Sequence, residues 1–85
     1  MSDQSAPTAV AVLTHIVKSI VDHPDEVEVQ LSDTDDGIRL DVTVADGDMG
    51  RVIGKRGRVA SAIRTVVRAA GHDDDSGPIE VEFVD

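Results

Sequence analysis

Apolar residues recur along this 85-residue chain with two different periods, which divide it into helices and strands. From Thr8, which we expect to be an N-cap, the spacing is that of one helical face as far as Val21. Pro24 ends this first helix by Asp22 or His23. The apolar face of the predicted helix holds Val10, Leu13, Ile16, Val17, Ile20 and Val21.

Two segments with a period of two follow, and together they predict a β-hairpin. In residues 26–32 and again in residues 38–44 every second residue is apolar, which is typical of strands with one buried and one wet face. The turn between them ends in Asp36-Gly37, a strong hairpin signal. The residues expected on the buried face are Val27, Val29, Leu31, Ile38, Leu40, Val42 and Val44.

The second half of the chain predicts two helices separated by a glycine-containing loop. Asp46 or Asp48 can cap a short helix, which residues 54–57 (Gly-Lys-Arg-Gly) then interrupt. A longer helix begins near Arg58, and we expect Gly71 to end it in the left-handed conformation. The expected buried stripe of this helix is Val59, Ile63, Val66, Val67 and Ala70.

A last strand is predicted where Ile79, Val81 and Phe83 alternate with acidic residues. The order is then helix, strand, strand, helix, helix, strand. Three half-buried strands and three helices, with the helices gathered on the apolar face of one sheet, predict a two-layer α+β fold. Residues 1–7 are expected to be a disordered tail, and residues 8–85 a single domain.

Composition narrows the class of protein. The chain has 40% hydrophobic residues, one aromatic residue and no Cys, which suits one small core in a reducing compartment and excludes disulfides and thiol catalysis. No apolar run approaches the roughly 18 residues of a membrane span, and the N-terminus lacks the pattern of a signal peptide. We therefore expect a cytoplasmic protein with no membrane partner.

Charge is distributed very unevenly along the chain. Eight basic and 17 acidic residues give a net charge of −9, which taken alone disfavours nucleic acid as a partner. No acidic residue falls within residues 49–72, however, so this segment carries +6 and the remainder carries −15. The six cations, which predict an anion-binding surface, are Arg51, Lys55, Arg56, Arg58, Arg64 and Arg68.

The loop at residues 54–57 has the chemistry to receive a phosphate backbone. Gly54 and Gly57 lack a Cβ, so a sugar-phosphate chain can approach the main chain, while Lys55 and Arg56 bring charge to the tip. The next helix begins directly after Gly57, and the unpaired N–H groups of its first turn favour an anion. A basic, hydroxyl-bearing ridge continues along that helix through Arg58, Ser61, Thr65, Arg68 and His72.

The segment 49–64, with its Val-Ile-Gly-Lys-Arg-Gly string, resembles the core of a KH domain. The order of elements is similar to the type II KH arrangement of bacteria, and the resemblance covers about residues 8–84, as in small bacterial proteins with a single KH domain. It implies that the loop grips the backbone of about four unpaired nucleotides, with the bases on an apolar groove. Many KH domains have a large aliphatic residue three positions after the second glycine, where this chain has Ala60. The expected RNA-binding residues are Arg51, Val52, Ile53, Gly54, Lys55, Arg56, Gly57, Arg58 and Ser61.

The resemblance also implies partners. Such proteins pair with themselves and with a larger KH-containing protein of the Jag type, and the function implied is that of a post-transcriptional regulator or RNA chaperone acting as a dimer. Weak binding by one copy fits this, because the buried position expected for Phe83 leaves no aromatic stacking platform. The wet face of the sheet should repel phosphate, since it carries Glu26, Glu28, Asp41, Glu80 and Glu82 against Arg39 alone.

The sequence also allows functions other than RNA binding. The strongest alternative is a protein-interaction or dimerisation scaffold of KH fold with little RNA affinity. The net charge of −15 outside residues 49–72 favours it. Duplex DNA is disfavoured because there is no long basic recognition helix. The three histidines are scattered, and the sequence contains no Walker A string or Ser-His-Asp order, so we expect no enzyme activity, metal or cofactor. A β-branched residue at Gly54 is expected to weaken RNA binding more than stability.

Overall fold

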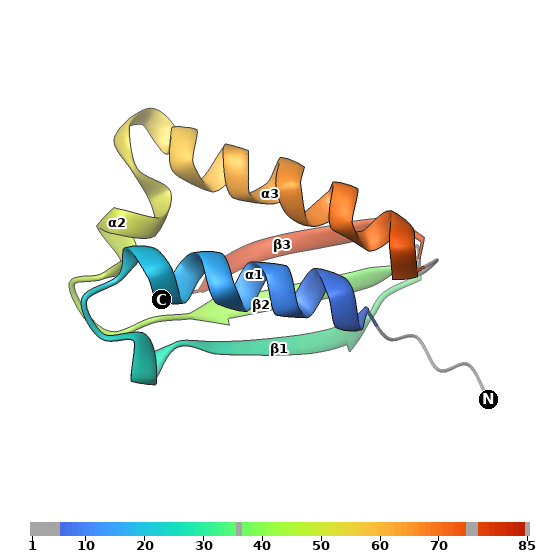
Figure 1. Ribbon diagram of the computed structural model, residues 1–85, viewed down its shortest axis with the longest axis horizontal. Helices are drawn as coiled ribbons and strands as arrows, with labels where there is room; N and C mark the ends of the chain where they lie inside the picture. The colour runs from blue at the N-terminus through green and yellow to red at the C-terminus, as the bar shows by residue number, and fades with distance from the viewer. Residues whose placement is uncertain (1–5, 36, 75–76, 85) are drawn as a thin grey trace.

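The computed structural model describes residues 6–35, 37–74 and 77–84 (Figure 1). The predicted order of elements is confirmed. The helices and strands are α1 (Pro7–Ile20), β1 (Glu28–Asp33), β2 (Ile38–Thr43), α2 (Met49–Ile53), α3 (Arg58–Gly71) and β3 (Ile79–Val84). Short 3-10 turns occupy Pro24–Glu26, Lys55–Gly57 and His72–Asp74.

The three strands form one mixed sheet in the order β1-β2-β3. The hairpin makes β1 antiparallel to β2, whereas β3 runs parallel to β2 after the crossover through α2 and α3. Leu40 of the central strand lies between Leu31 of β1 and Val81 of β3. Figure 1 shows α1 and α3 side by side on one face of the sheet, with α2 at one end. The two-layer α+β prediction is thereby confirmed.

The core lies between the helices and the sheet. The central strand β2 contributes its whole inward face, as the alternation predicted, whereas Leu31 of the edge strand β1 remains 36% exposed because β1 lies at the margin of the helical layer. Phe83 packs partly buried against this core. The most deeply buried side chains are Leu13, Val17, Ile38, Leu40, Val42, Val52, Val67 and Val81.

The buried stripe of α3 differs from the predicted one. Ala60, Ile63, Val67 and Gly71 face the core, whereas Val66 is 48% exposed. The helix contacts the sheet along a narrow stripe spaced by three or four residues, which places Val66 outside it. Gly71 belongs to the helix rather than to a left-handed cap, and a Cβ there would collide with the side chain of Ile79. The predictions for Val66 and Gly71 are therefore wrong.

The beginning of α1 also differs from the prediction. The helix begins at Pro7, and Ala6 is buried, so the predicted tail of residues 1–7 extends too far by these two residues; residues 1–5 lie outside the described part of the chain. Thr8 is not the N-cap. Its N–H and that of Ala9 donate to the two carboxylate oxygens of Asp74, at 3.0 and 2.9 Å. Burial raises the pKa of Asp74, but these donors outweigh it and hold the pKa below its usual value.

The wet face of the sheet is acidic, as predicted, but one of the acidic residues expected there lies outside the sheet. Glu26 lies in the 3-10 turn before β1 and not on the sheet. Arg39 on this face pairs with Asp41, Nε to Oδ1 at 2.8 Å, so its charge is already neutralised locally. The acidic residues aligned on this face are Glu28, Asp41, Glu80 and Glu82.

Candidate nucleic-acid interface

The loop between α2 and α3 is a tight turn built from left-handed backbone. Gly54 has φ 72° and ψ −176°, Arg56 has φ 56° and Gly57 has φ 70°. The turn closes on itself, because Gly54 N–H donates to the Gly50 carbonyl at 2.9 Å and Gly57 N–H to the Gly54 carbonyl at 3.4 Å. This conformation places the loop directly before the first turn of α3. The N–H of Arg58 donates to the Lys55 carbonyl, and the N–H groups that follow it in this turn carry the positive end of the helix dipole.

The two glycines have different roles in this turn. A Cβ on Gly54 would collide with the side chain of Val59, which packs directly against the Gly54 backbone. At Gly57 the space around an added Cβ is open within 4 Å. Gly54 is therefore required by packing inside the protein, and Gly57 leaves an accessible main-chain surface for a ligand.

The cations predicted for the site surround this loop. Lys55, Arg56 and Arg58 are exposed, and they follow one another around the turn. Arg51 is also exposed, but its Nε pairs with Oδ2 of Asp22 at 3.2 Å. The structure thus brings three predicted cations together at the start of α3, with the charge of Arg51 partly neutralised beside them.

The apolar residues predicted for a base-binding groove divide into two kinds. The side chain of Ile53 is 39% exposed at the end of α2 and is available to a ligand. Val52 is fully buried in the core, so the prediction that its side chain contacts a base is wrong. Ala60 is 3% exposed and packs beneath the first turn of α3, whereas Ser61 points to solvent.

The ridge along α3 is exposed, as predicted, and two arginines have contacts that the sequence did not predict: Arg68 of the ridge and Arg64 beside it. Arg64 Nε donates to the Val81 carbonyl at 3.0 Å, and Arg68 Nε donates to the Ile79 carbonyl at 3.4 Å. The Arg64 guanidinium also lies 5.3 Å from the centre of the Phe83 ring. The spacing of four residues between the two arginines was the only sequence signal for this pair, because it places both on one side of the helix.

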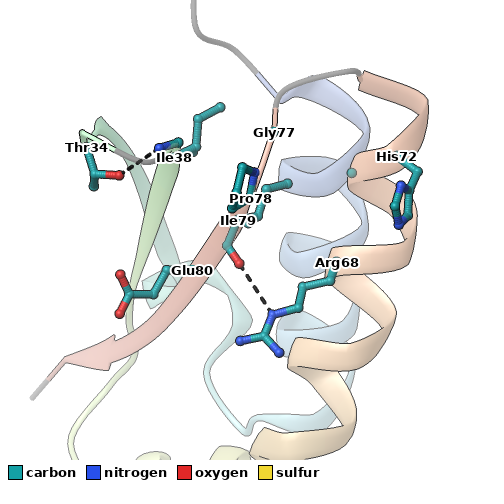
Figure 2. A pocket seen from close by; sticks show the side chains of 10 residues that line it. Thr34, Ile38, Arg68, His72, Gly77, Pro78, Ile79 and Glu80 are labelled. Carbon is teal, nitrogen blue, oxygen red and sulfur yellow. Dashed lines mark hydrogen bonds between the residues drawn. The ribbon is translucent and has the colours of Figure 1, made fainter.

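A recess of about 830 Å³ opens between the C-terminal half of α3, the start of β3 and the β1–β2 turn. Figure 2 shows Arg68 and His72 on the α3 side and Glu80 on the strand side. Ile79 and Pro78 contribute apolar surface. The recess lies at the end of the basic ridge that is farthest from the loop.

Asp48 anchors the segment that leads into α2. Its side chain is 3% exposed, and Oδ2 accepts from the N–H of His23 at 3.0 Å and lies 3.2 Å from His23 Nδ1. The hydrogen bond and the charge of Asp48 raise the pKa of His23. Burial raises the pKa of Asp48, but the His23 side chain and the backbone N–H groups of His23 and Asp22 outweigh it and lower the pKa. Asp48 thus ties the start of α2 to the segment that follows α1. Its side chain does not cap α2.

This pair predicts a pH dependence of stability. The contribution of His23 to the free energy of unfolding is fully present below its ordinary pKa of 6.5. It is lost as the pH rises through the raised pKa. The contribution of Asp48 to the free energy of unfolding is fully present above its ordinary pKa of 3.8. It is lost as the pH falls through the lowered pKa. The stabilising window therefore lies between about pH 4 and 6.5. In urea denaturation, the deficit of His23→Gln relative to the parent should be largest near pH 5 and shrink towards pH 9.

The matched control for this measurement is His15→Gln, which changes an exposed histidine of α1. Its difference from the parent should be small throughout the same range. A deficit of His23→Gln that does not change with pH would contradict the proposed ion pair.

Two further observations on the described residues concern membrane spans and metal ions. No helix in residues 6–35, 37–74 and 77–84 is long and apolar enough to cross a membrane. In the same ranges, no three His, Asp or Glu side chains come together in a way that could hold a metal ion.

A Gly-x-x-Gly turn between two helices, on a sheet whose last strand runs parallel to the central one, defines a type II KH domain. The family model described as "KhpA/KhpB, KH domain" matches residues 10–82, so the chain belongs to the KhpA/KhpB family of KH domains. The resemblance to small KH proteins of the KhpA type is thereby confirmed. The family is one of binding domains rather than enzymes, in agreement with the expectation from the sequence.

Three relatives named "RNA-binding protein KhpA" illustrate the similarity. The protein of Listeria monocytogenes is 46% identical over 70 residues, which cover 82% of this chain and 91% of the relative. That of Leifsonia xyli is 48% identical over 73 residues, 86% of this chain and 92% of the relative. That of Bacillus subtilis is 52% identical over 59 residues, 69% of this chain and 73% of the relative.

Proposed function

We propose that this protein binds single-stranded RNA, and that the loop at residues 54–57 grips the backbone of about four nucleotides. The observation that carries the proposal is the exposed Lys55-Arg56 tip, set on left-handed backbone immediately before the N-terminus of α3. Phosphates there meet side-chain cations and free backbone N–H groups together. The relatives named RNA-binding protein KhpA support the same function.

The charge on the two faces of the protein supports binding on the helical side. The loop and the α3 ridge carry the cations, whereas the open face of the sheet carries the carboxylates of Glu28, Asp41, Glu80 and Glu82. Phe83 packs against the core and so offers no stacking surface on that open face. RNA bound to the loop therefore extends along α3, and the acidic sheet reduces non-specific binding elsewhere.

A dimer is part of the proposed function. One loop that neutralises about three phosphates binds weakly, and two linked copies gain affinity because the second contact becomes intramolecular. The family model covers both KhpA and KhpB domains, which suits a second copy or a larger Jag-type KH protein as the partner. In this form the protein would act in the cytoplasm as a post-transcriptional regulator or RNA chaperone.

The function can be tested by comparing short single-stranded RNA, single-stranded DNA and duplex RNA in a fluorescence-anisotropy titration at one salt concentration. We expect the single-stranded RNA to bind most tightly. With about three phosphates neutralised, the logarithm of the affinity should fall with a slope near −2 against the logarithm of salt, or roughly twentyfold between 50 and 200 mM. A preference for duplex, or an affinity insensitive to salt, would count against the loop as the binding site.

The competing proposal is a KH-fold scaffold that binds proteins and not RNA. It is favoured by the −15 outside the basic segment and by exposed aliphatic side chains such as Ile53 and Val66. Charge reversal at Lys55 and Arg56 separates the two, because a scaffold would keep its partner and its activity after this change.

A further inference from the structure

Two arginines of α3 occupy the outer edge of β3. The sheet order places β3 at an edge, and the hydrogen bond from Ile38 N–H to the Pro78 carbonyl shows which side of the strand faces β2. Because successive carbonyls alternate along a strand, those of Ile79 and Val81 point to the free edge. These are the two carbonyls that accept from Arg68 and Arg64.

This arrangement determines which hydrogen-bonding groups the edge presents. With the two carbonyls occupied, the edge offers guanidinium donors where an open strand would offer acceptors. Each Nε is engaged with the backbone, which leaves the two Nη groups to act as a fork; Figure 2 shows this orientation for Arg68. Of the ion pairs within the described residues, none involves Arg64 or Arg68.

The guanidinium groups are oriented before any ligand arrives, that of Arg64 more firmly than that of Arg68. Arg64 is held by the Val81 carbonyl and by the Phe83 ring beneath it, and it is only partly exposed. Arg68 is exposed and lines the recess, and its longer contact with the Ile79 carbonyl, 3.4 Å from Nε, orients it towards β3. A fixed fork loses less conformational entropy on binding than a free side chain does. Such a fork suits recognition of a planar partner with two adjacent acceptors.

We propose that Arg64 and Arg68 give the RNA site a preference for guanine. The inference rests on the proposed binding of single-stranded RNA. Guanine presents O6 and N7 side by side as two acceptors, which match an arginine fork, whereas adenine presents an amino donor beside N7 and cytosine an amino donor at N4. An edge that presents guanidinium donors at the Ile79 and Val81 carbonyls therefore favours guanine and disfavours the amino groups of adenine and cytosine.

The positions of the charges support an RNA strand that runs along α3 with its bases towards β3. Arg68 lies ten residues after Arg58 on the same helix, about 15 Å along its axis, so a strand held at the loop passes both arginines. Phosphates are attracted to the α3 rim and repelled by Glu80 on the opposite rim of the recess. The bases are thereby directed towards β3, where the apolar surface of Ile79 and Pro78 and the Arg68 guanidinium lie together.

The test uses four eight-nucleotide RNAs of adenosine that differ at one internal position, carrying adenosine, guanosine, 7-deazaguanosine or 2-aminopurine. The last two lack N7 and O6 respectively, so each removes one acceptor without changing the protein. The parent should bind the guanosine RNA about tenfold more tightly than the other three. The variant Arg64→Lys/Arg68→Lys keeps the charge but loses the fork, so it should bind all four RNAs within about twofold of one another.

Two further variants make the outcomes distinguishable. Arg39→Lys changes an arginine on the wet face of the sheet and should keep the guanine preference, whereas Lys55→Asp/Arg56→Asp should lose affinity for all four RNAs. The inference is overturned if the parent shows no guanine preference, if the 7-deaza and 2-aminopurine RNAs bind as well as guanosine, or if the double lysine variant keeps the preference. If the parent binds none of the RNAs, both the proposed RNA binding and the guanine preference are refuted. If Arg64→Lys/Arg68→Lys is too unstable to measure, the affinities of the parent protein for the four RNAs test the inference by themselves.

Discussion

Replacing both Lys55 and Arg56 by Asp should leave the protein folded and lower its affinity for single-stranded RNA by about two orders of magnitude or more. Hydrogen bonds to charged groups contribute roughly 1.5–3 kcal/mol each, and the change removes two such contacts and adds repulsion at the loop tip. The fold should tolerate it, because both side chains are exposed and Asp is among the residues that accept the left-handed backbone of Arg56. Filter binding or anisotropy gives the affinity, and a thermal melt gives the stability.

The matched control is Lys18→Asp/Arg39→Asp, which changes the net charge equally but lies on α1 and on the wet face of the sheet. It should keep most of the RNA affinity at moderate salt. RNA retention that is unchanged in the loop variant would refute the assignment of the loop. If partner binding also persisted there, the scaffold hypothesis would be favoured.

Gly54→Ala should destabilise the protein by about 2–6 kcal/mol, much or all of the roughly 5 kcal/mol expected for so small a domain. The backbone at φ 72° and ψ −176° lies in a region that only glycine adopts readily, which costs about 1–3 kcal/mol for alanine. The new Cβ also collides with Val59, and overpacking costs a further 1–3 kcal/mol or so. Urea denaturation measures the loss.

Two variants separate these causes. Gly57→Ala places alanine at φ 70° and ψ 13°, a left-handed conformation that alanine adopts more easily than that of Gly54, and the space around its Cβ is open, so it should lose only about 1–2 kcal/mol. Gly54→Ala/Val59→Ala relieves the collision and should recover part of the loss caused by Gly54→Ala alone. Equal stability of Gly54→Ala and Gly57→Ala would contradict the close packing of Val59 on Gly54. The expectation from the sequence that a residue at Gly54 affects binding more than stability is thus revised.

The sequence predicted well what depends on local pattern. The alternation in residues 38–44 predicted the buried face of β2, and the Asp-Gly turn predicted the hairpin. The Gly-Lys-Arg-Gly interruption predicted the break between α2 and α3, because glycine, charge and helix spacing all act within a few residues. The same local pattern predicted the order of elements, which is similar to that of type II KH domains and which the structure confirms.

What the sequence could not predict depends on contacts between distant parts of the chain. Asp74 caps α1 from 66 residues away, and no local signal near Thr8 indicates it. Val52 and Val66 share the same apolar chemistry, and only the docking of α2 and α3 on the sheet decides that the first is buried and the second exposed. The contacts of Arg64 with β3 depend on the same docking.

The most direct measurement is an NMR titration of the ¹⁵N-labelled protein with a short single-stranded RNA. If the loop and the N-terminus of α3 hold the RNA backbone, the largest amide shifts should fall on residues 54–58 and along the exposed face of α3, with β1 and the wet face of the sheet unchanged. Shifts that spare residues 54–58, or that gather on the acidic face of the sheet, would contradict this site.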